Sequence, residues 1–263
     1  MLPPMDLDLT LGCGQVFRWF KRGDDWSGVV DGREIELRQG PAGVEVRGEV
    51  SKSRLTSYFR AEDDLDTIYE EVAVDDLMRD LASRFGGMRL IRQDPWECCL
   101  SYLLATNANF PRIQRMVEAV CIAFGPRLPG GRHAFPSPSD ILDREERALH
   151  CGLGYRCERL VKLANKVDGG ELDLEALMEM DYSESIDHLK GFEGIGDKVA
   201  DCIALFCLDH LEAFPVDVRI RRVMEEVYGV SGSYRRVRES GQRYFGRYAG
   251  YAQELLYHWD GSR

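Results

Sequence analysis

The sequence predicts an α+β protein in which a small N-terminal antiparallel β-sheet domain precedes a mainly helical, two-lobed body. Short apolar alternations separated by turn residues fill roughly the first 50 residues, which is typical of β-structure. Asp94 can cap a helix that has Pro95 at its first position, and from there helical blocks separated by loops rich in glycine and proline continue almost to residue 263. We therefore expect a sheet domain with flanking helices over residues 1–88 and a helical body over 89–263.

The turns of the first segment define its elements. Asp31-Gly32 lies between two apolar alternations, and this dipeptide favours a two-residue hairpin turn. Gly40 to Gly43 supplies the next turn, and residues 51–60 follow as a capped helix. The strands expected from these signals are 15–19, 26–30, 33–38 and 44–46.

Composition limits the class of protein. Apolar residues make up 44% of the 263 residues and charged residues 30%, as in ordinary globular proteins. No apolar run approaches the ~18 residues that a membrane span requires, and the start lacks a secretory signal pattern. We expect a cytoplasmic, nucleoid-associated or nuclear protein. The eight cysteines form no Cys-x-x-Cys pair, so we expect buried thiols and neither a metal nor a cofactor.

The net charge of −11 argues at first against a nucleic-acid partner. Attraction to phosphate depends on local charge, however, and residues 218–247 carry eight arginines against three glutamates. A run of charge is more often a solvated helix face than a binding patch. This stretch therefore supports DNA binding only weakly.

A glycine-rich turn between two helical segments is the most informative feature. One helix is expected to end near Leu189 and the next to begin near Asp197, and Gly191, Gly194 and Gly196 permit a tight turn with positive φ between them. This pattern predicts a helix–hairpin–helix motif at about 185–207. Its unpaired backbone N–H groups can hold a DNA phosphate without a basic side chain.

Two side chains near this turn suggest chemistry. Lys198 lies in the first turn of the second helix, where the helix dipole and partial burial are expected to lower its pKa and make a free amine accessible. Asp217 follows Pro215 at the expected start of a further helix, and its carboxylate could stabilise positive charge on a sugar. Alone, either residue would be a solvated lysine or a helix cap. Their combination favours a catalytic pair.

The chain resembles the helix–hairpin–helix–Gly/Pro–Asp superfamily of DNA glycosylases and, within it, the 8-oxoguanine DNA glycosylase/AP-lyase family. The resemblance extends from about residue 9 to 258 and rests on six blocks in the same order: 14–19, 92–98, 124–128, 152–156, 198–203 and 248–253. It implies base excision by Lys198 through a Schiff base, with Asp217 as the essential carboxylate, and then strand cleavage by β-elimination.

The resemblance also implies a pocket for the flipped base. The Gly14 carbonyl would accept the N7–H that distinguishes 8-oxoguanine from guanine. Gln253 would bind the Watson–Crick edge, and Cys202 and Tyr257 would contact the two faces of the base. Tyr257 stands where the family usually has phenylalanine, and Arg219 where it often has histidine.

The remaining implied residues contact duplex DNA, the expected partner of a monomeric enzyme. Asn107 would fill the space left by the base, beside Ala108 in place of the family's asparagine, and Tyr155 would wedge into the stack. Arg112 and Arg156 would bind the orphaned cytosine. Gly194 and Gly196 would hold a phosphate.

Two alternatives remain open at this stage. A glycosylase for a different lesion would keep Lys198 or Asp217 without Gly14 and Gln253 in a matching pocket. The adenine and pyrimidine branches also commonly carry a four-cysteine cluster, which this sequence lacks. A non-catalytic helix–hairpin–helix DNA-binding module would have no use for the pairing of Lys198 with Asp217.

Overall fold

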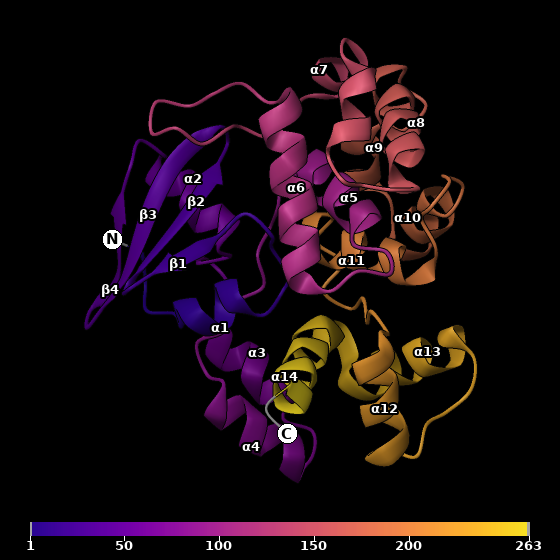
Figure 1. The fold of residues 1–263 in the computed structure, drawn as a ribbon. Helices are drawn as coiled ribbons and strands as arrows, with labels where there is room; N and C mark the ends of the chain where they lie inside the picture. The colour runs from indigo at the N-terminus through magenta and orange to yellow at the C-terminus, as the bar shows by residue number, and fades with distance from the viewer. Residues whose placement is uncertain (1, 262–263) are drawn as a thin grey trace.

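The computed structural model describes residues 2–261 and contains the predicted N-terminal sheet (Figure 1). Four antiparallel strands pair in sequence order: β1 Phe20–Arg22, β2 Asp25–Val30, β3 Arg33–Gly40 and β4 Gly43–Arg47. Asp31 and Gly32 connect β2 to β3 with φ angles of 48° and 70°, and Val30 pairs with Arg33. The predicted hairpin is confirmed, because both central residues have the left-handed conformation that such a turn requires.

The strand predicted at 15–19 is wrong. This segment is irregular and buried, and its polar groups bond to distant residues. The Gln15 amide donates to the carbonyls of Thr10 at 2.7 Å and Arg89 at 2.9 Å, and the Tyr102 hydroxyl donates to the Gln15 carbonyl at 3.1 Å. These bonds satisfy groups that would otherwise need a neighbouring strand.

Helices make up most of the rest of the chain. One of them, α1 (Leu7–Gly12), begins at the Asp6 cap and lies within the segment predicted to be β-structure. The predicted Ser51 and Asp94 caps are confirmed at the starts of α2 and α5. The further helices are α2 Lys52–Tyr58, α3 Leu65–Val72, α4 Asp76–Arg84, α5 Pro95–Leu104, α6 Phe110–Phe124, α7 Pro138–Leu142, α8 Arg156–Asp168, α9 Leu174–Glu179, α10 Tyr182–Leu189, α11 Asp197–Cys207, α12 Val218–Glu226, α13 Tyr234–Phe245 and α14 Ala249–Gly261, with short 3-10 turns at Glu145–His150 and Gly246–Tyr248.

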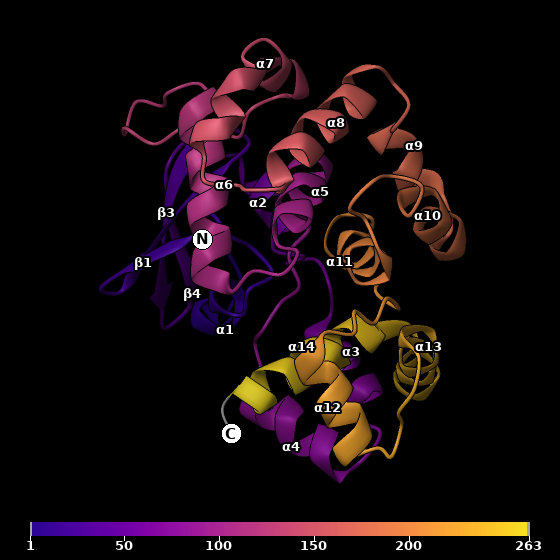
Figure 2. The same cartoon turned by 45° about the vertical axis from the view of Figure 1, so that its right-hand side comes forward.

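Two hydrophobic clusters organise these elements. The smaller one lies under the sheet and includes Trp19, Leu37 and Phe59. The larger one runs through the helical body and includes Ile68 of α3 and Leu81 of α4. Figures 1 and 2 show α3 and α4 beside α14, so an early part of the chain packs against the last helix. The predicted division at residue 88 stays a prediction.

The cysteines are free thiols, and all except the partly buried Cys157 are buried, as predicted. Within residues 2–261, no helix combines the length and the apolar character that crossing a membrane would require.

Candidate active site

The helix–hairpin–helix is present where the sequence predicted it. Helix α10 ends at Leu189, and α11 begins at Asp197 with Gly196 as its N-cap. Of the three hairpin glycines only Gly194 has positive φ, at 92°, so the expectation was wrong for Gly191 and Gly196. A β-carbon on Gly194 would lie 2.6 Å from Leu103 Cδ1, which makes a side chain there difficult to accommodate.

Ion pairs brace this hairpin against the neighbouring helices. Lys190 bonds to Asp197 across the turn at 2.5 Å, and Lys162 of α8 bonds to Glu193 at 2.8 Å. These pairs fix the side chains around the turn. The turn backbone, rather than a cluster of free lysines, is therefore the feature suited to a phosphate.

The arginine-rich stretch is less basic than its composition suggests. Arg235 bonds to Glu239 at 2.6 Å, and Arg222 bonds to the buried Asp260. Arg247 forms a similar pair with Glu71 of α3. These arginines have local carboxylate partners, so their charge attracts DNA less than the residue count implied.

The predicted catalytic and base-pocket residues line one cavity of about 260 Å³. Helix α11 contributes Lys198 and Cys202, and Asp217 enters from the start of α12. The last helix and the loop after α1 complete the lining with Gln253, Tyr257 and Gly14. Residues that are up to 243 positions apart in sequence therefore converge, as the resemblance implied.

Asp217 is held by the fold as well as presented to the cavity. It is the N-cap of α12, and its carboxylate accepts a hydrogen bond from the Ile220 N–H at 2.8 Å. A carboxylate is favourable at this end of a helix because of the exposed N–H groups. The Asp217 side chain is partly buried and lines the cavity together with Lys198.

The predicted lowering of the Lys198 pKa is wrong in direction. Burial does lower it, but Cys202, Asp217 and Glu254 act in the opposite sense, and the pKa is raised overall. The effect of burial is outweighed by the interactions with Cys202, Asp217 and Glu254, in that order. Burial raises the pKa of the Cys202 thiol to about 11, so that thiol is neutral near pH 7. The direction of the Lys198 pKa shift therefore favours the ammonium form.

Glu254 is a site residue that the sequence reasoning missed. It is 5% exposed and lines the same cavity, and one of its oxygens, Oε2, has no hydrogen-bond partner within the described part of the chain. Burial raises its pKa to about 7, although the nearby Lys198 acts against this shift. The available signal was a lone glutamate inside the apolar run of α14, because such residues are rarely buried without a role.

Cys13 and His258 lie beside Glu254. Their ligand-capable atoms and a Glu254 oxygen lie within 4.8 Å of one another, the one such group among residues 2–261. The Cys13 thiol donates to the Thr10 carbonyl at 3.5 Å, and burial, with the Glu254 charge adding to it, raises the pKa of this thiol well above its usual value. We interpret this group as a buried polar cluster, of which Cys13 and Glu254 line the cavity.

The walls of the cavity are aromatic on two sides. The Lys198 ammonium lies 5.4 Å from the centre of the Tyr102 ring, which stacks on Phe206 with centroids 5.6 Å apart. The Arg219 guanidinium lies 4.7 Å from the centre of the Tyr257 ring. The two departures from the family pattern at 219 and 257 are thus in contact with each other.

The predicted DNA-contacting residues gather at a second place. Asn107 is exposed with φ of 52°, and its amide lies 3.5 Å from the hydroxyl of the half-exposed Tyr155. Arg112 is exposed in the first turn of α6. Arg156 is buried, and its guanidinium donates to the carbonyls of Thr106 and Asn107. In this structure Arg156 therefore holds the loop that carries Asn107.

A buried carboxyl group anchors α11 to its neighbours. Asp201 accepts hydrogen bonds from Tyr182 of α10 and, at 2.6 Å, from Tyr234 of α13. Burial raises the pKa of Asp201 to about 6, and the two phenols and Arg238 oppose this shift. The network fixes the helix that carries Lys198, and sequence reasoning did not identify it.

Comparison with known proteins agrees with this arrangement over nearly the whole chain. Residues 3–99 match the family model described as 8-oxoguanine DNA glycosylase, N-terminal domain. Residues 100–247 match the model described as HhH-GPD superfamily base excision DNA repair protein. The boundary between the two matches falls within α5.

Individual relatives align with nearly the whole of this chain. An N-glycosylase/DNA lyase of Arabidopsis thaliana is 33% identical over 96% of this chain and 76% of its own length. A probable N-glycosylase/DNA lyase of Methanothermobacter thermautotrophicus is 28% identical over 96% of this chain and 92% of its own. The Clostridium acetobutylicum 8-oxoguanine glycosylase/lyase, solved with duplex DNA containing cytosine opposite 8-oxoguanine, superposes with a TM-score of 0.92 and 28% identity over 98% of this chain and 92% of that one. The chain therefore belongs to the HhH-GPD superfamily of base excision DNA repair proteins, in its 8-oxoguanine DNA glycosylase family.

Proposed function

We propose that this protein excises 8-oxoguanine, preferably opposite cytosine, from duplex DNA and then cleaves the strand through a Schiff base on Lys198. One observation supports this most directly. A lysine and a carboxylate from separate helices share a cavity with Gly14 and Gln253, the residues expected to read the damaged base. A glycosylase of different specificity would not need both of these readers, and a non-catalytic module would not need the cavity.

In the proposed reaction, Lys198 Nζ attacks C1′ of the flipped nucleotide while the bond from C1′ to the base breaks. Positive charge develops on the sugar, and the Asp217 carboxylate is positioned to stabilise it, because both groups face the same cavity. Ring opening gives a Schiff base between the lysine and the sugar. Loss of a C2′ proton then expels the 3′ phosphate by β-elimination.

The groups proposed to recognise the base are the Gly14 carbonyl and the Gln253 side-chain amide, both at the cavity wall. Gly14 has φ of 99°, which turns the chain at the cavity wall, and its carbonyl would accept the N7–H of 8-oxoguanine. Gln253 Oε1 is buried and has no hydrogen-bond partner among residues 2–261, so it can accept from the N–H groups on the Watson–Crick edge. Cys202 and Tyr257 would cover the faces of the base.

Outside the cavity, Asn107 would occupy the vacated space and Tyr155 would wedge beside it. Both are exposed and adjacent, which supports a joint role. Arg112 would bind the unpaired cytosine, and Arg156 would join it only by leaving the carbonyls it now holds. Gly194 and Gly196 would place hairpin N–H groups against a phosphate. Since one chain supplies all these residues, we propose a monomer.

Borohydride trapping on a duplex with 8-oxoguanine opposite cytosine tests this function. We expect wild type to form a covalent complex and Lys198→Gln to form none, because glutamine cannot make a Schiff base. Lys52→Gln, an exposed lysine in α2, is the matched control and should trap like wild type. Binding without trapping in wild type would contradict the lyase assignment, and normal trapping by Lys198→Gln would exclude this lysine as nucleophile.

A further inference from the structure

We propose that Glu254 is the proton acceptor that converts Lys198 to its nucleophilic form and then returns the proton to the departing base. This inference rests on the function proposed above. Glu254 is buried and lines the same cavity as Lys198, and it has no part in the excision steps described above.

The position of Glu254 is the first support. It follows Gln253 on α14 and lines the cavity together with Lys198 and Asp217. One of its oxygens has no hydrogen-bond partner among the described residues. A buried carboxyl oxygen without a partner is costly, so its retention at a reactive site indicates a use.

The second support is that Lys198 needs an acceptor. Its pKa is raised overall, so it carries a proton that must leave before the amine can attack. Asp217 is poorly suited to take it, because a proton on Asp217 would remove the charge that faces the developing cation. The thiol of Cys202 and the phenol of Tyr257 cannot take the proton either. Burial raises their pKa values to about 11 and about 12, so both groups are already protonated near neutral pH.

Glu254 is suited to this exchange. Burial raises its pKa to about 7, which makes its carboxylate a stronger base than an ordinary glutamate while leaving it ionised above neutral pH. Lys198 and Glu254 affect each other's pKa, which is consistent with their shared cavity. The titratable groups that face Glu254 or influence its charge come from four elements and the loop after α1: Cys13, Tyr102, Lys198, Cys202, Asp217, Tyr257 and His258.

The proposed proton transfers balance. Lys198 ammonium and Glu254 carboxylate become amine and carboxylic acid, with no change in total charge. The amine lone pair then forms the bond to C1′, and the electron pair of the bond between C1′ and the base leaves with the base. The base takes the proton from Glu254, which restores the carboxylate, while the attached lysine nitrogen carries the positive charge.

Single-turnover excision measured from pH 6 to 9 with Glu254→Gln tests the proposal. In wild type we expect the rate to rise about tenfold from pH 6 to 8 and then level, as Glu254 ionises. In the variant we expect a rate about 100-fold lower at pH 8 that keeps rising with pH, because the lysine proton must leave to solvent. Glu254→Asp keeps a carboxylate and should restore the levelling.

Controls separate a chemical role from a structural one. Duplex affinity and thermal unfolding of Glu254→Gln should match or exceed those of wild type, and Glu179→Gln, an exposed position in α9, should keep the wild-type pH profile. A Glu254→Gln rate that levels at the wild-type value would overturn the proposal. Absence of excision by wild type would instead contradict the proposed function, so the two failures are distinguishable.

Discussion

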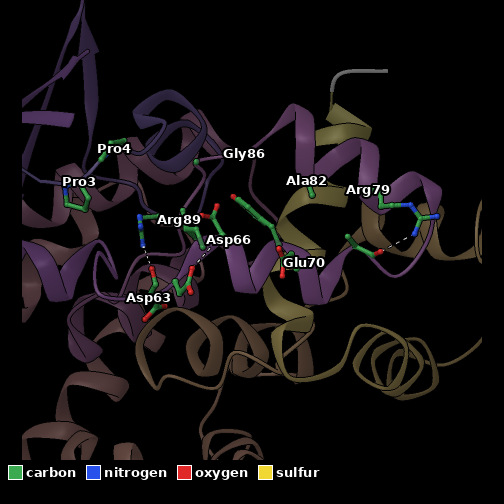
Figure 3. A pocket seen from close by; sticks show the side chains of 14 residues that line it. Pro3, Pro4, Asp63, Asp66, Glu70, Arg79, Ala82, Gly86 and Arg89 are labelled. Atoms are coloured by element: carbon green, nitrogen blue, oxygen red, sulfur yellow. Dashed lines mark hydrogen bonds between the residues drawn. The ribbon is translucent and has the colours of Figure 1, made fainter. Parts of the chain in front are cut away.

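Two hollows in this molecule differ in size and in chemistry. The larger, of about 890 Å³, lies among the N-terminal segment, α3 and α4 and is lined by the carboxylates of Asp63, Asp64, Asp66 and Glu70 (Figure 3). The smaller, of about 260 Å³, contains Lys198 between helices that are distant in sequence. An acidic hollow repels phosphate, whereas a cavity with one reactive amine can attack a sugar. Volume is therefore a poor guide to the site here.

The arginines of the larger hollow do not change this conclusion. Arg89 is buried and donates to the carbonyls of Arg60 and Asp63, and Arg79 pairs with Asp76. Their donors are directed into the fold or to a neighbouring carboxylate. Among the described residues, buried atoms without a hydrogen-bond partner occur at both hollows: Asp63 Oδ2 and Arg89 Nε at the larger one, Gln253 Oε1 and Glu254 Oε2 at the smaller one. The difference is that Lys198 lines the smaller cavity together with them. The comparison indicates that unused hydrogen-bonding capacity beside a reactive group marks the site.

The largest effect that would test this comparison is expected for Asp217→Asn. Asparagine caps a helix as well as aspartate does, so α12 should stay folded while the charge facing the sugar is lost. We expect excision to slow by about 10²–10³-fold, as for the loss of one stabilising group at a developing charge. Single-turnover rates measure this, and duplex affinity within a few fold of wild type shows that binding survives. An unchanged rate would remove Asp217 from the chemistry.

A smaller effect is expected on stability from Glu254→Gln. The folded-state pKa of about 7 lies above the ordinary 4.5, so the folded protein binds more protons, and stability falls as pH rises from 4.5 to 7. The neutral variant avoids this loss and should be more stable by roughly 1–3 kcal/mol above pH 7, with the difference vanishing near pH 4.5. Thermal melts at pH 5 and pH 8 measure it. An equal Tm difference at both values would contradict the assigned shift.

A paired glycine substitution tests the hairpin. Gly194→Ala forces positive φ on alanine and places its β-carbon against Leu103, so we expect a loss of roughly 1–3 kcal/mol of stability. Gly196→Ala has an ordinary φ and open space around its β-carbon, so its effect should be smaller. Denaturant unfolding of the two variants gives the comparison. If both lose the same stability, the geometry assigned to Gly194 is not what constrains that position.

The smallest effect is expected in the acidic hollow. Asp66 is exposed there and is absent from the lining of the small cavity, so Asp66→Asn should leave the excision rate within about twofold of wild type. The same single-turnover assay serves as the readout. A loss comparable with that of Asp217→Asn would mean that the larger hollow participates in the reaction and that the comparison is wrong.

The sequence predicted those parts of the fold that are set by local signals. The Asp31-Gly32 hairpin, the caps at Ser51 and Asp94 and the limits of α11 depend on nearby residues and were recognisable. The segment at 15–19 was misread because its apolar alternation resembles a strand, while its conformation depends on the distant Arg89 and Tyr102. Long-range hydrogen bonds of this kind leave no local pattern.

The candidate site also has features that the sequence predicted and features that depend on distant residues. The Lys198 and Asp217 positions follow from spacing and resemblance, and their convergence needed only the expected fold. The direction of the Lys198 pKa shift was mispredicted, because the effects of Cys202 and Asp217, which together with Glu254 outweigh burial, depend on how the fold places these groups around the amine. The burial of Arg156 depends likewise on carbonyls of a separate loop.

The ammonium form of Lys198 has a consequence for chemical selectivity. Cells contain free sugars and other aldehydes that condense with unprotonated amines, and a protonated lysine has no lone pair to offer them. The proposed nucleophile, held in this form, would therefore not condense with small carbonyl compounds between encounters with damaged DNA. It would become reactive only when a nearby group removes the proton.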